Sequence, residues 1–182
     1  MLKKTLRIFI GLVIVLTITI IYLLSDFNAI YKNEEFVFIT TELKKAQKED
    51  FQSFISTYNK IYAKIKEPSC PCQNIANKIT NNPYTSLSKR TLYLLKIKKE
   101  FTHDECLKLV LIHYDFGFGK IGIKEASKFY LKKDLKQLNE KEIITLVVMF
   151  RNAALYNPIR NKERLDAKVL LFEKNIKSIK LI

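Results

Sequence analysis

The chain has 182 residues, of which 48% are hydrophobic and 27% are charged, and its formal net charge is +14. This composition is that of a globular protein and excludes an intrinsically disordered chain. The length suits one domain with a short additional segment. The excess of Lys and Arg favours anionic partners, such as a phosphorylated substrate or an acidic membrane surface, although a solvated basic surface explains the charge equally well.

The N-terminal segment is typical of a membrane anchor. Lys3, Lys4 and Arg7 precede an uncharged, mostly apolar run from Ile8 to Leu24. This run is close to the shortest one that crosses a bilayer core of about 30 Å. A secretory signal peptide is the alternative, but no small-residue cleavage motif follows the run.

We therefore predict a basic cytoplasmic stub over residues 1–7, a transmembrane helix over 8–24, a membrane-proximal segment over 25–39 and a folded domain over 40–182. Because the cations precede the span, the N-terminus is expected in the cytoplasm and the domain outside it, in the plasma membrane. A domain on that side of the membrane has no nucleic acid as partner.

The rest of the chain reads as helices, without repeats or strand-rich regions. Apolar residues recur at spacings of three and four between Thr41 and Lys66, which predicts one helix ended by Pro68 and Pro71. Further helices are expected over 73–80, over 88–99 with Leu92, Leu95 and Tyr93 inward, from a Thr102–Glu105 capping box to 113, over 123–132, over 140–151 with an Asn139–Glu142 capping box, and from 161 toward 177. The sequence therefore predicts an all-α fold.

Glycines are concentrated in one place. The chain has four glycines, and Gly117, Gly119 and Gly122 lie within one short stretch. Such clustering marks a backbone that needs positive φ or a close approach to another group. A tight connection between two helices is the simplest interpretation.

Three cysteines, Cys70, Cys72 and Cys106, lie in the domain. A site outside the cytoplasm permits a disulfide, and the odd number leaves at least one thiol over or paired between chains. Cys70 and Cys72 are too close in sequence to pair well with each other, so either of them can pair with Cys106. A metal site at Cys-Pro-Cys lacks a nearby histidine, and His103 and His113 are expected as surface or packing residues.

The glycine-rich stretch belongs to a longer pattern. The matching residues run without gaps over the second half of the domain; they are Phe116, Gly117, Gly119, Gly122, Ile123, Ala126, Tyr130, Tyr156, Asn157, Pro158, Arg160, Asn161, Glu163 and Arg164. This region resembles the C-terminal half of the family 51 glycosyltransferases, the peptidoglycan transglycosylases that polymerise lipid II. The resemblance implies a lysozyme-like helical domain that acts on lipid II or a nascent glycan strand beside membrane lipid.

In the resembling family, a glutamate in an E-D-x-x-F-x-x-H-x-G motif takes the proton from the acceptor 4-hydroxyl, which displaces undecaprenyl pyrophosphate. Thr40-Thr41-Glu42 resembles the start of that motif, so Glu42 is the candidate base. The Phe, His and Gly of the motif are absent here. An acidic residue in the first turn of a helix is the alternative interpretation of Glu42.

A second family motif, S-T-I-T-Q-Q-L-A-K-N, aligns with residues 69–78. Ser69 and Gln73 match it and Asn74 is a shortened amide, which makes these three residues candidate substrate contacts, together with Gly117 and Gly119 of the glycine stretch.

The third motif, R-K-x-x-E, supplies the second glutamate of the family, which helps a divalent metal, Mg or Mn, to hold the pyrophosphate. Arg90 takes the glutamate position in one register and Tyr93 takes it in the other, so neither register gives a carboxylate. Lys89 and Arg90 remain as cations for phosphate oxygens.

Two functions follow from this pattern. One is a short, divergent glycosyltransferase that uses Glu42 and has weak or lost activity. The other is a non-catalytic protein that holds lipid II or glycan, or docks on cell-wall synthases. The preserved scaffold residues support the family, whereas the missing carboxylate favours binding without turnover.

Overall fold

A computed structural model describes residues 2–63, 65–79 and 87–177. The helices of these residues are α1 (Leu2–Leu23), α2 (Glu34–Ala46), α3 (Gln52–Tyr62), α4 (Pro71–Ile79), α5 (Leu87–Glu100), α6 (His103–His113), α7 (Ile123–Ala126), α8 (Glu140–Arg151) and α9 (Lys162–Lys177). Short turns are η1 (Ala29–Lys32), η2 (Ser127–Leu131) and η3 (Leu135–Gln137). The described ranges contain no β-strand, and their extended pairing is limited to one isolated bridge between Asp115 and Ile121. The predicted all-α class is therefore confirmed for these ranges.

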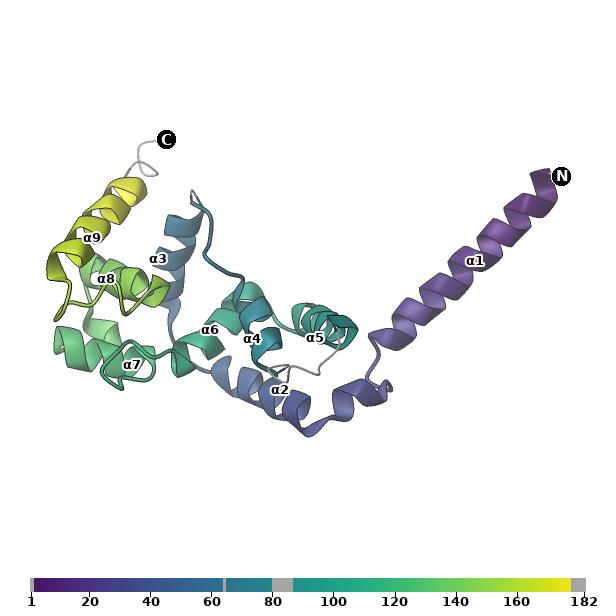
Figure 1. Cartoon of the computed structure of the whole chain (residues 1–182), viewed down its shortest axis with the longest axis horizontal. Helices are drawn as coiled ribbons and strands as arrows, with labels where there is room; N and C mark the ends of the chain where they lie inside the picture. Colours follow the sequence, from purple (N-terminus) through teal and green to yellow (C-terminus); the bar gives the residue numbers. More distant parts are fainter. Residues whose placement is uncertain (1, 64, 80–86, 178–182) are drawn as a thin grey trace.

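The helices pack into two groups that share α6. Buried residues of α3, α8 and α9 form one core cluster, and buried residues of η1, α2, α4 and α5 form the other. Leu107 and Leu111 of α6 belong to the first cluster, whereas Cys106 and Leu109 belong to the second. Figure 1 shows α1 projecting from one end of the molecule and α7, α8 and α9 at the opposite end.

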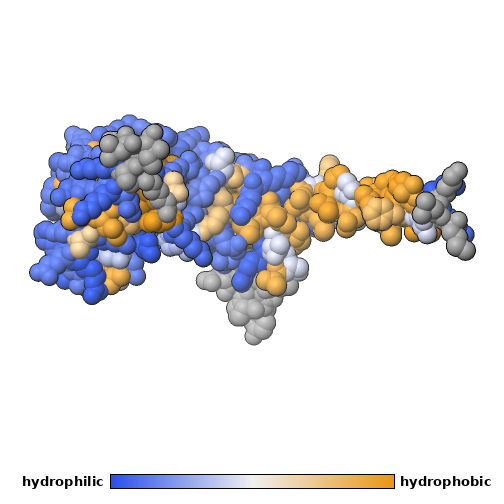
Figure 2. All heavy atoms as spheres, turned by 90° about the horizontal axis from the view of Figure 1, so that it is seen from above, coloured by the Kyte–Doolittle hydropathy of each residue, from blue (hydrophilic) through white to orange (hydrophobic). Residues whose placement is uncertain are grey.

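Helix α1 is a candidate membrane span. Within Lys4–Leu23, an 18-residue window has a mean hydropathy of 2.5, and none of this window is buried against the rest of the chain. Figure 2 shows its apolar surface continuing away from a largely hydrophilic domain. Length and composition therefore suffice for crossing a bilayer, although a signal sequence passes the same test.

The single helix predicted from Thr41 to Lys66 is wrong, because the structure has α2 and α3 there with a turn between them. The carbonyl of Gln47 accepts a hydrogen bond from Lys108 Nζ at 2.8 Å, and Glu49 pairs with Lys124. Phe51 is buried at the start of α3. Contacts from distant segments thus replace the helical bonds that local periodicity predicts.

Helix α2 also begins before the predicted start of the domain. The side chain of Asn33 accepts a hydrogen bond from the Glu35 amide and caps α2, so the predicted boundary between residues 39 and 40 falls inside a helix. Tyr31 and Phe36 pack with Tyr93 of α5, with ring centroids 6.2 and 4.7 Å from that of Tyr93. The segment after α1 is therefore part of the second core cluster.

The predicted helix starts at both capping boxes are confirmed. Thr102 Oγ1 accepts a hydrogen bond from the Glu105 amide, and Glu105 accepts one from the Thr102 amide. Asn139 and Glu142 form the same reciprocal pair before α8. As predicted, α8 is central: its residues 143, 144 and 146–149 are all buried. The predicted helix over 123–132 is also present, as α7 followed by the π-helical turn η2.

Helix α5 buries a different face from the one predicted. Tyr93, Lys96 and Ile97 are buried, whereas Leu95 is 46% exposed, so the inward placement of Leu95 is wrong. The reason is that Lys96 has partners inside the fold that a hydrophobic pattern cannot reveal.

The Lys96 ammonium group lies 2.6 Å from Asp26 Oδ1 and 2.8 Å from Glu100 Oε1, and it donates a hydrogen bond to the Leu24 carbonyl at 3.1 Å. Its side chain is only 4% exposed, and its Nζ lies 5.3 Å from the Tyr31 ring centroid. Burial opposes the charge, but the hydrogen bonds to Asp26 and Glu100 outweigh it and raise the pKa of Lys96 above 10.5. The same hydrogen bond and the positive charge lower the pKa of Asp26 below 3.8.

The structure determines which cysteines pair. Cys72 of α4 and Cys106 of α6 form a disulfide, with Cα atoms 5.1 Å apart, and Cys70 keeps a free thiol. Of the two pairings that the sequence leaves open, the bond from Cys72 is therefore the one formed. It joins α4 to the helix that both core clusters share.

The glycine-rich loop has the backbone that its composition predicts. Gly117, Gly119 and Gly122 have φ of +91°, +67° and +88°. A Cβ on Gly122 would lie 2.8 Å from the carbonyl oxygen of Ile112, so the loop passes against the backbone of α6. Nothing lies within 4 Å of the corresponding position on Gly119.

We expect Gly122→Val to lower the free energy of unfolding by about 1–3 kcal/mol, since it adds a backbone clash to an unfavourable φ. Gly119→Val is the matched control, because it has positive φ without the clash. Thermal unfolding followed by circular dichroism measures both variants. Equal losses would show that the approach to Ile112 does not matter.

We expect Lys96→Met to lower the free energy of unfolding by about 1–3 kcal/mol through lost hydrogen bonds to charged groups. The lowered pKa of Asp26 means that its contribution is lost only as pH falls below 3.8, and the raised pKa of Lys96 means that its contribution is lost only above 10.5. The loss should therefore be constant between about pH 5 and pH 9.

Chemical denaturation at several pH values tests this, with Lys98→Met on exposed surface of α5 as control. A loss no larger than that of the control would contradict a stabilising role for the buried ammonium group.

Candidate functional site

The main concave surface of the described residues runs along α4. Three adjoining cavities of about 550, 270 and 390 Å³ all have Lys78 in their walls. We call them together the Lys78 groove. It begins between α2 and α4, continues against α6, and ends beside α3 and α8.

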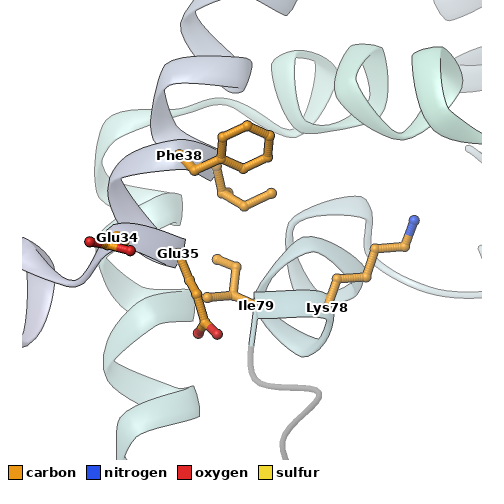
Figure 3. A pocket seen from close by; sticks show the side chains of 6 residues that line it. Glu34, Glu35, Phe38, Lys78 and Ile79 are labelled. Carbon is orange, nitrogen blue, oxygen red and sulfur yellow. The ribbon is translucent and has the colours of Figure 1, made fainter.

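The outer part of the groove is apolar with charged edges. Phe38 and Ile39 of α2 face Ile79 of α4, and Phe38 is 64% exposed although it is a large aromatic side chain. Figure 3 shows Phe38 on α2 and Lys78 beside Ile79 on α4, with Glu35 at the α2 side. Glu34 and Glu35 share this part of the lining with Lys78, so its apolar wall suits a hydrocarbon chain. An anionic head fits further in, where Lys78 and then Arg151 line the groove without an acidic residue among the described lining.

The inner part of the groove combines hydroxyl and amide side chains with aromatic rings. Ser69, Asn74 and Asn77 line it, together with the aromatic side chains of Tyr114 and Phe150 and with Arg151. Asn74 Nδ2 donates a hydrogen bond to Ser69 Oγ at 2.8 Å. The structure therefore brings two of the predicted substrate contacts together in a wall of the groove.

Gln73, a third predicted contact, is oriented through its neighbour. Its Nε2 donates a hydrogen bond to Asn77 Oδ1 at 3.0 Å, and Asn77 lines the groove. Gln73 itself is not among the described residues that line the cavities. Its effect on a ligand would pass through Asn77.

Glu42 lies on α2, one helical turn after Phe38 and Ile39, and therefore on the same side of the helix as the groove wall. Its side chain is 22% exposed and pairs with Lys45 Nζ at 2.8 Å. Glu42 is not among the described residues that line the groove, so helical spacing alone relates its carboxylate to the groove wall. Its role as a base remains a prediction.

The predicted cations Lys89 and Arg90 lie on the first turn of α5 and are half-buried. Lys89 Nζ lies 5.4 Å from the Tyr93 ring centroid. Tyr93, which takes the glutamate position in the second register, is a buried core residue whose hydroxyl donates a hydrogen bond to the Ile30 carbonyl. In the register that puts Arg90 at the glutamate position, Ser86 stands where the motif has its Arg, and Ser86 lies outside the described residues.

Gly117 and Gly119, the remaining predicted contacts, lie in the loop before α7 and are not among the described residues that line the Lys78 groove. A Cβ on Gly117 would lie 3.2 Å from Asn157 Nδ2 and 3.4 Å from the Tyr130 hydroxyl oxygen. The close approach of those groups explains why a glycine stands at position 117. A substrate contact at either position remains a prediction.

The segment that carries Ser69 is held by a hydrogen-bonded cluster. Tyr58 donates a hydrogen bond to Glu67 Oε1 at 2.5 Å, and His103 Nε2 lies 2.9 Å from the same oxygen. His103 Nδ1 lies 3.3 Å from Asp104 Oδ1. Burial raises the pKa of Tyr58, and the hydrogen bond to Glu67 raises it further, so its hydroxyl stays protonated and donates. His103 is a packing residue at the surface, as predicted.

A divalent metal is implied by the family resemblance, and the described residues do not fit it. They contain no group of three or more His, Cys, Asp or Glu side chains that could hold a metal ion. Divalent ions in such sites need carboxylate ligands. We therefore derive no chemistry through a metal.

Sequence reasoning missed the groove-lining Phe38, Lys78 and Arg151. Lys78 lies four residues after Asn74, so helical spacing places both on one face of α4 and could have indicated it. Phe38 and Arg151 come from other helices and carry no local signal, because only the packing of α2 and α8 around α4 brings them to the groove.

The sequence profile of the Transglycosylase family matches residues 72–176, more than half of the chain. The chain belongs to the transglycosylase family. The match spans α4 to α9, which includes the disulfide, the glycine-rich loop and most of the inner groove, and it begins after the segment that carries Glu42.

Curated relatives agree with this assignment. Penicillin-binding protein 1F of Bacillus subtilis is 27% identical over 57% of this chain and 15% of its own length. Penicillin-binding protein 4 of the same bacterium is 23% identical over 76% of this chain and 24% of its own length. Penicillin-binding protein 2a of Streptococcus pneumoniae is 26% identical over 49% and 13%. The chain therefore spans less than a quarter of the length of these relatives.

Proposed function

We propose that this chain is a divergent, membrane-anchored peptidoglycan glycosyltransferase-like protein that binds lipid II in the Lys78 groove and polymerises it weakly or not at all. The observation that carries the proposal is the groove itself, in a domain of the transglycosylase family. Its outer wall has the exposed ring of Phe38, and Lys78 lines each of its three cavities.

Lipid II suits such a groove because it combines an apolar chain, a pyrophosphate and a disaccharide. The apolar outer wall would receive the chain, and Lys78 would meet the pyrophosphate. The amides of Asn74 and Asn77 and the Arg151 side chain offer hydrogen-bond partners for sugar and peptide groups. Binding therefore requires none of the family motif residues that this chain lacks.

Polymerisation requires more than binding, and the supporting groups are fewer. A general base must reach the acceptor hydroxyl, and Glu42 is the candidate beside the groove, where it is paired with Lys45. Where the family has its second glutamate, this chain has Arg90 in one register and Tyr93 in the other, so neither supplies a carboxylate. The alternative function, a non-catalytic protein that holds lipid II or glycan strands or docks on other cell-wall synthases, rests on this missing carboxylate.

The anchor and its orientation belong to the same proposal. Helix α1 would hold the domain at the plasma membrane, with Lys3, Lys4 and Arg7 on the cytoplasmic side. The disulfide between Cys72 and Cys106 supports a domain outside the cytoplasm, because disulfides persist in oxidising compartments.

We expect the purified protein in detergent to bind lipid II, and Lys78→Ala to weaken binding about tenfold or more, because a hydrogen bond to a charged group contributes about 1.5–3 kcal/mol. Lys141→Ala, an exposed lysine on α8, is the matched control. Fluorescence anisotropy of labelled lipid II measures both. Equal binding by the two variants would show that Lys78 does not contact the pyrophosphate.

In the same preparation, we expect formation of glycan chains to be weak or undetectable on a gel, because loss of an effective general base costs about 10²–10⁴-fold in rate. Rapid chain formation that Glu42→Gln abolishes would contradict the loss of activity and establish Glu42 as the base. Absence of both binding and activity would leave docking on protein partners as the remaining function.

We expect a reporter fused to the C-terminus to be active when the reporter requires a location outside the cytoplasm, and inactive when it requires the cytoplasm. The reason is the basic flank on one side of α1. Labelling of intact cells with a membrane-impermeant thiol reagent provides the second measurement, since the free thiol of Cys70 should react when the domain lies outside the cytoplasm. The reverse pattern of reporters would overturn the orientation.

A further inference from the structure

A second surface of the domain combines cations and aromatic rings at the end opposite to α1. We call it the Phe129 patch; its members are Phe118, Lys120, Phe129, Lys132 and Arg160. They come from the glycine-rich loop, from η2 and the residue after it, and from the segment before α9. Figure 1 shows α7, which follows the loop, at the far end of the molecule from α1.

The two rings hold three cations close together. Lys120 Nζ and Lys132 Nζ lie 4.9 and 5.3 Å from the Phe129 ring centroid, and Arg160 Cζ lies 4.6 Å from that of Phe118. The two ring centroids are 6.5 Å apart. Three like charges gathered around two neighbouring rings repel one another, a cost that cation–π contacts offset only in part.

In the described part of the chain, none of these cations pairs with a carboxylate. Other exposed lysines nearby do so; Lys128 pairs with Asp134, for example. Asp115, an acidic residue of the same loop, accepts a hydrogen bond from the Gly117 amide at Oδ1 and so holds the loop. The patch thus keeps an unneutralised positive charge.

The backbone at the patch is strained in two places. Phe118 and Lys132 have φ of +56° and +57°, and they are the non-glycine residues with positive φ among those described. Side chains other than glycine adopt this conformation at a cost. Both strained residues contribute a ring or a cation to the same patch.

Exposed apolar groups surround the charges. Phe118 is 45% exposed, and Ile121 and Ile159 are 57% and 61% exposed. An anionic lipid surface does not fit the position of the patch, since the membrane-spanning candidate α1 leaves from the other end. A chain that offers both anionic groups and the apolar faces of sugar rings does fit it.

We propose that the Phe129 patch binds a glycan strand that carries carboxylates, outside the Lys78 groove. Lys120, Lys132 and Arg160 would pair with the carboxylates, and Phe118 with Ile121 would contact the sugar rings. This inference rests on the proposed location of the domain outside the cytoplasm, but it requires neither lipid II binding nor polymerisation.

The test is direct binding of the full chain in detergent to soluble peptidoglycan strands with free peptide carboxylates. We expect the double variant Lys120→Gln, Arg160→Gln to bind about tenfold more weakly or worse, since each lost charge pair contributes about 1 kcal/mol or more. The control double variant Lys141→Gln, Lys174→Gln removes the same charge from exposed positions on α8 and α9 and should bind as the wild type does.

Lys132→Gly removes a cation and its unfavourable φ together, so it should weaken strand binding without lowering the melting temperature. Lipid II binding should be unchanged in all these variants, which separates failure of the patch from failure of the groove. Equal weakening by the control pair would overturn the proposal. So would equally tight binding of uncharged chitooligosaccharides, or of linear polyphosphate, which has charge without sugar rings.

Discussion

The buried ammonium group of Lys96 is the interaction on which the arrangement of the chain depends. It connects α5 to the Leu24 carbonyl and to Asp26, immediately after the candidate membrane span. Tyr31 strengthens the same junction, since its hydroxyl donates a hydrogen bond to the Leu23 carbonyl at 2.9 Å. Because an uncompensated buried charge is costly, the segment after α1 stays docked on α5, and η1 and α2 begin from a fixed point. The position of Phe38 in the groove wall follows from that start.

Helix α6 connects this junction to the rest of the domain. It packs into both core clusters, is bonded covalently to α4 through Cys106, and contacts the glycine-rich loop where Gly122 meets the Ile112 carbonyl. The Lys78 groove is therefore built on packed helices, and α6, which lines part of it, also contacts the loop that carries two members of the Phe129 patch. Binding sites built on packed helices keep their geometry better than sites on isolated loops.

Local signals in the sequence predicted the helices with self-contained caps and the positive φ of the glycines. The same reasoning failed between Ala46 and Phe51, where Lys108 takes a carbonyl that a continuous helix would have used. It also failed on α5, because a hydrophobic pattern assigns a lysine to the surface and cannot anticipate Asp26 as its partner. In the candidate site, Ser69 and Asn74 could be found from a motif. Phe38 and Arg151 could not, because their positions follow from tertiary packing alone.

The disulfide gives the domain a dependence on its redox history. Cys72 precedes by two residues the asparagine that lines the groove, and the bond closes a sequence separation of 34 residues. A constraint of that length stabilises by about 3–4 kcal/mol in the chain-entropy model. Protein made in a reducing cytoplasm would lack the bond, and packing alone would hold α4 against α6. Recombinant material that has never met an oxidant would thus have a less constrained groove wall than the oxidised chain, even with every residue intact.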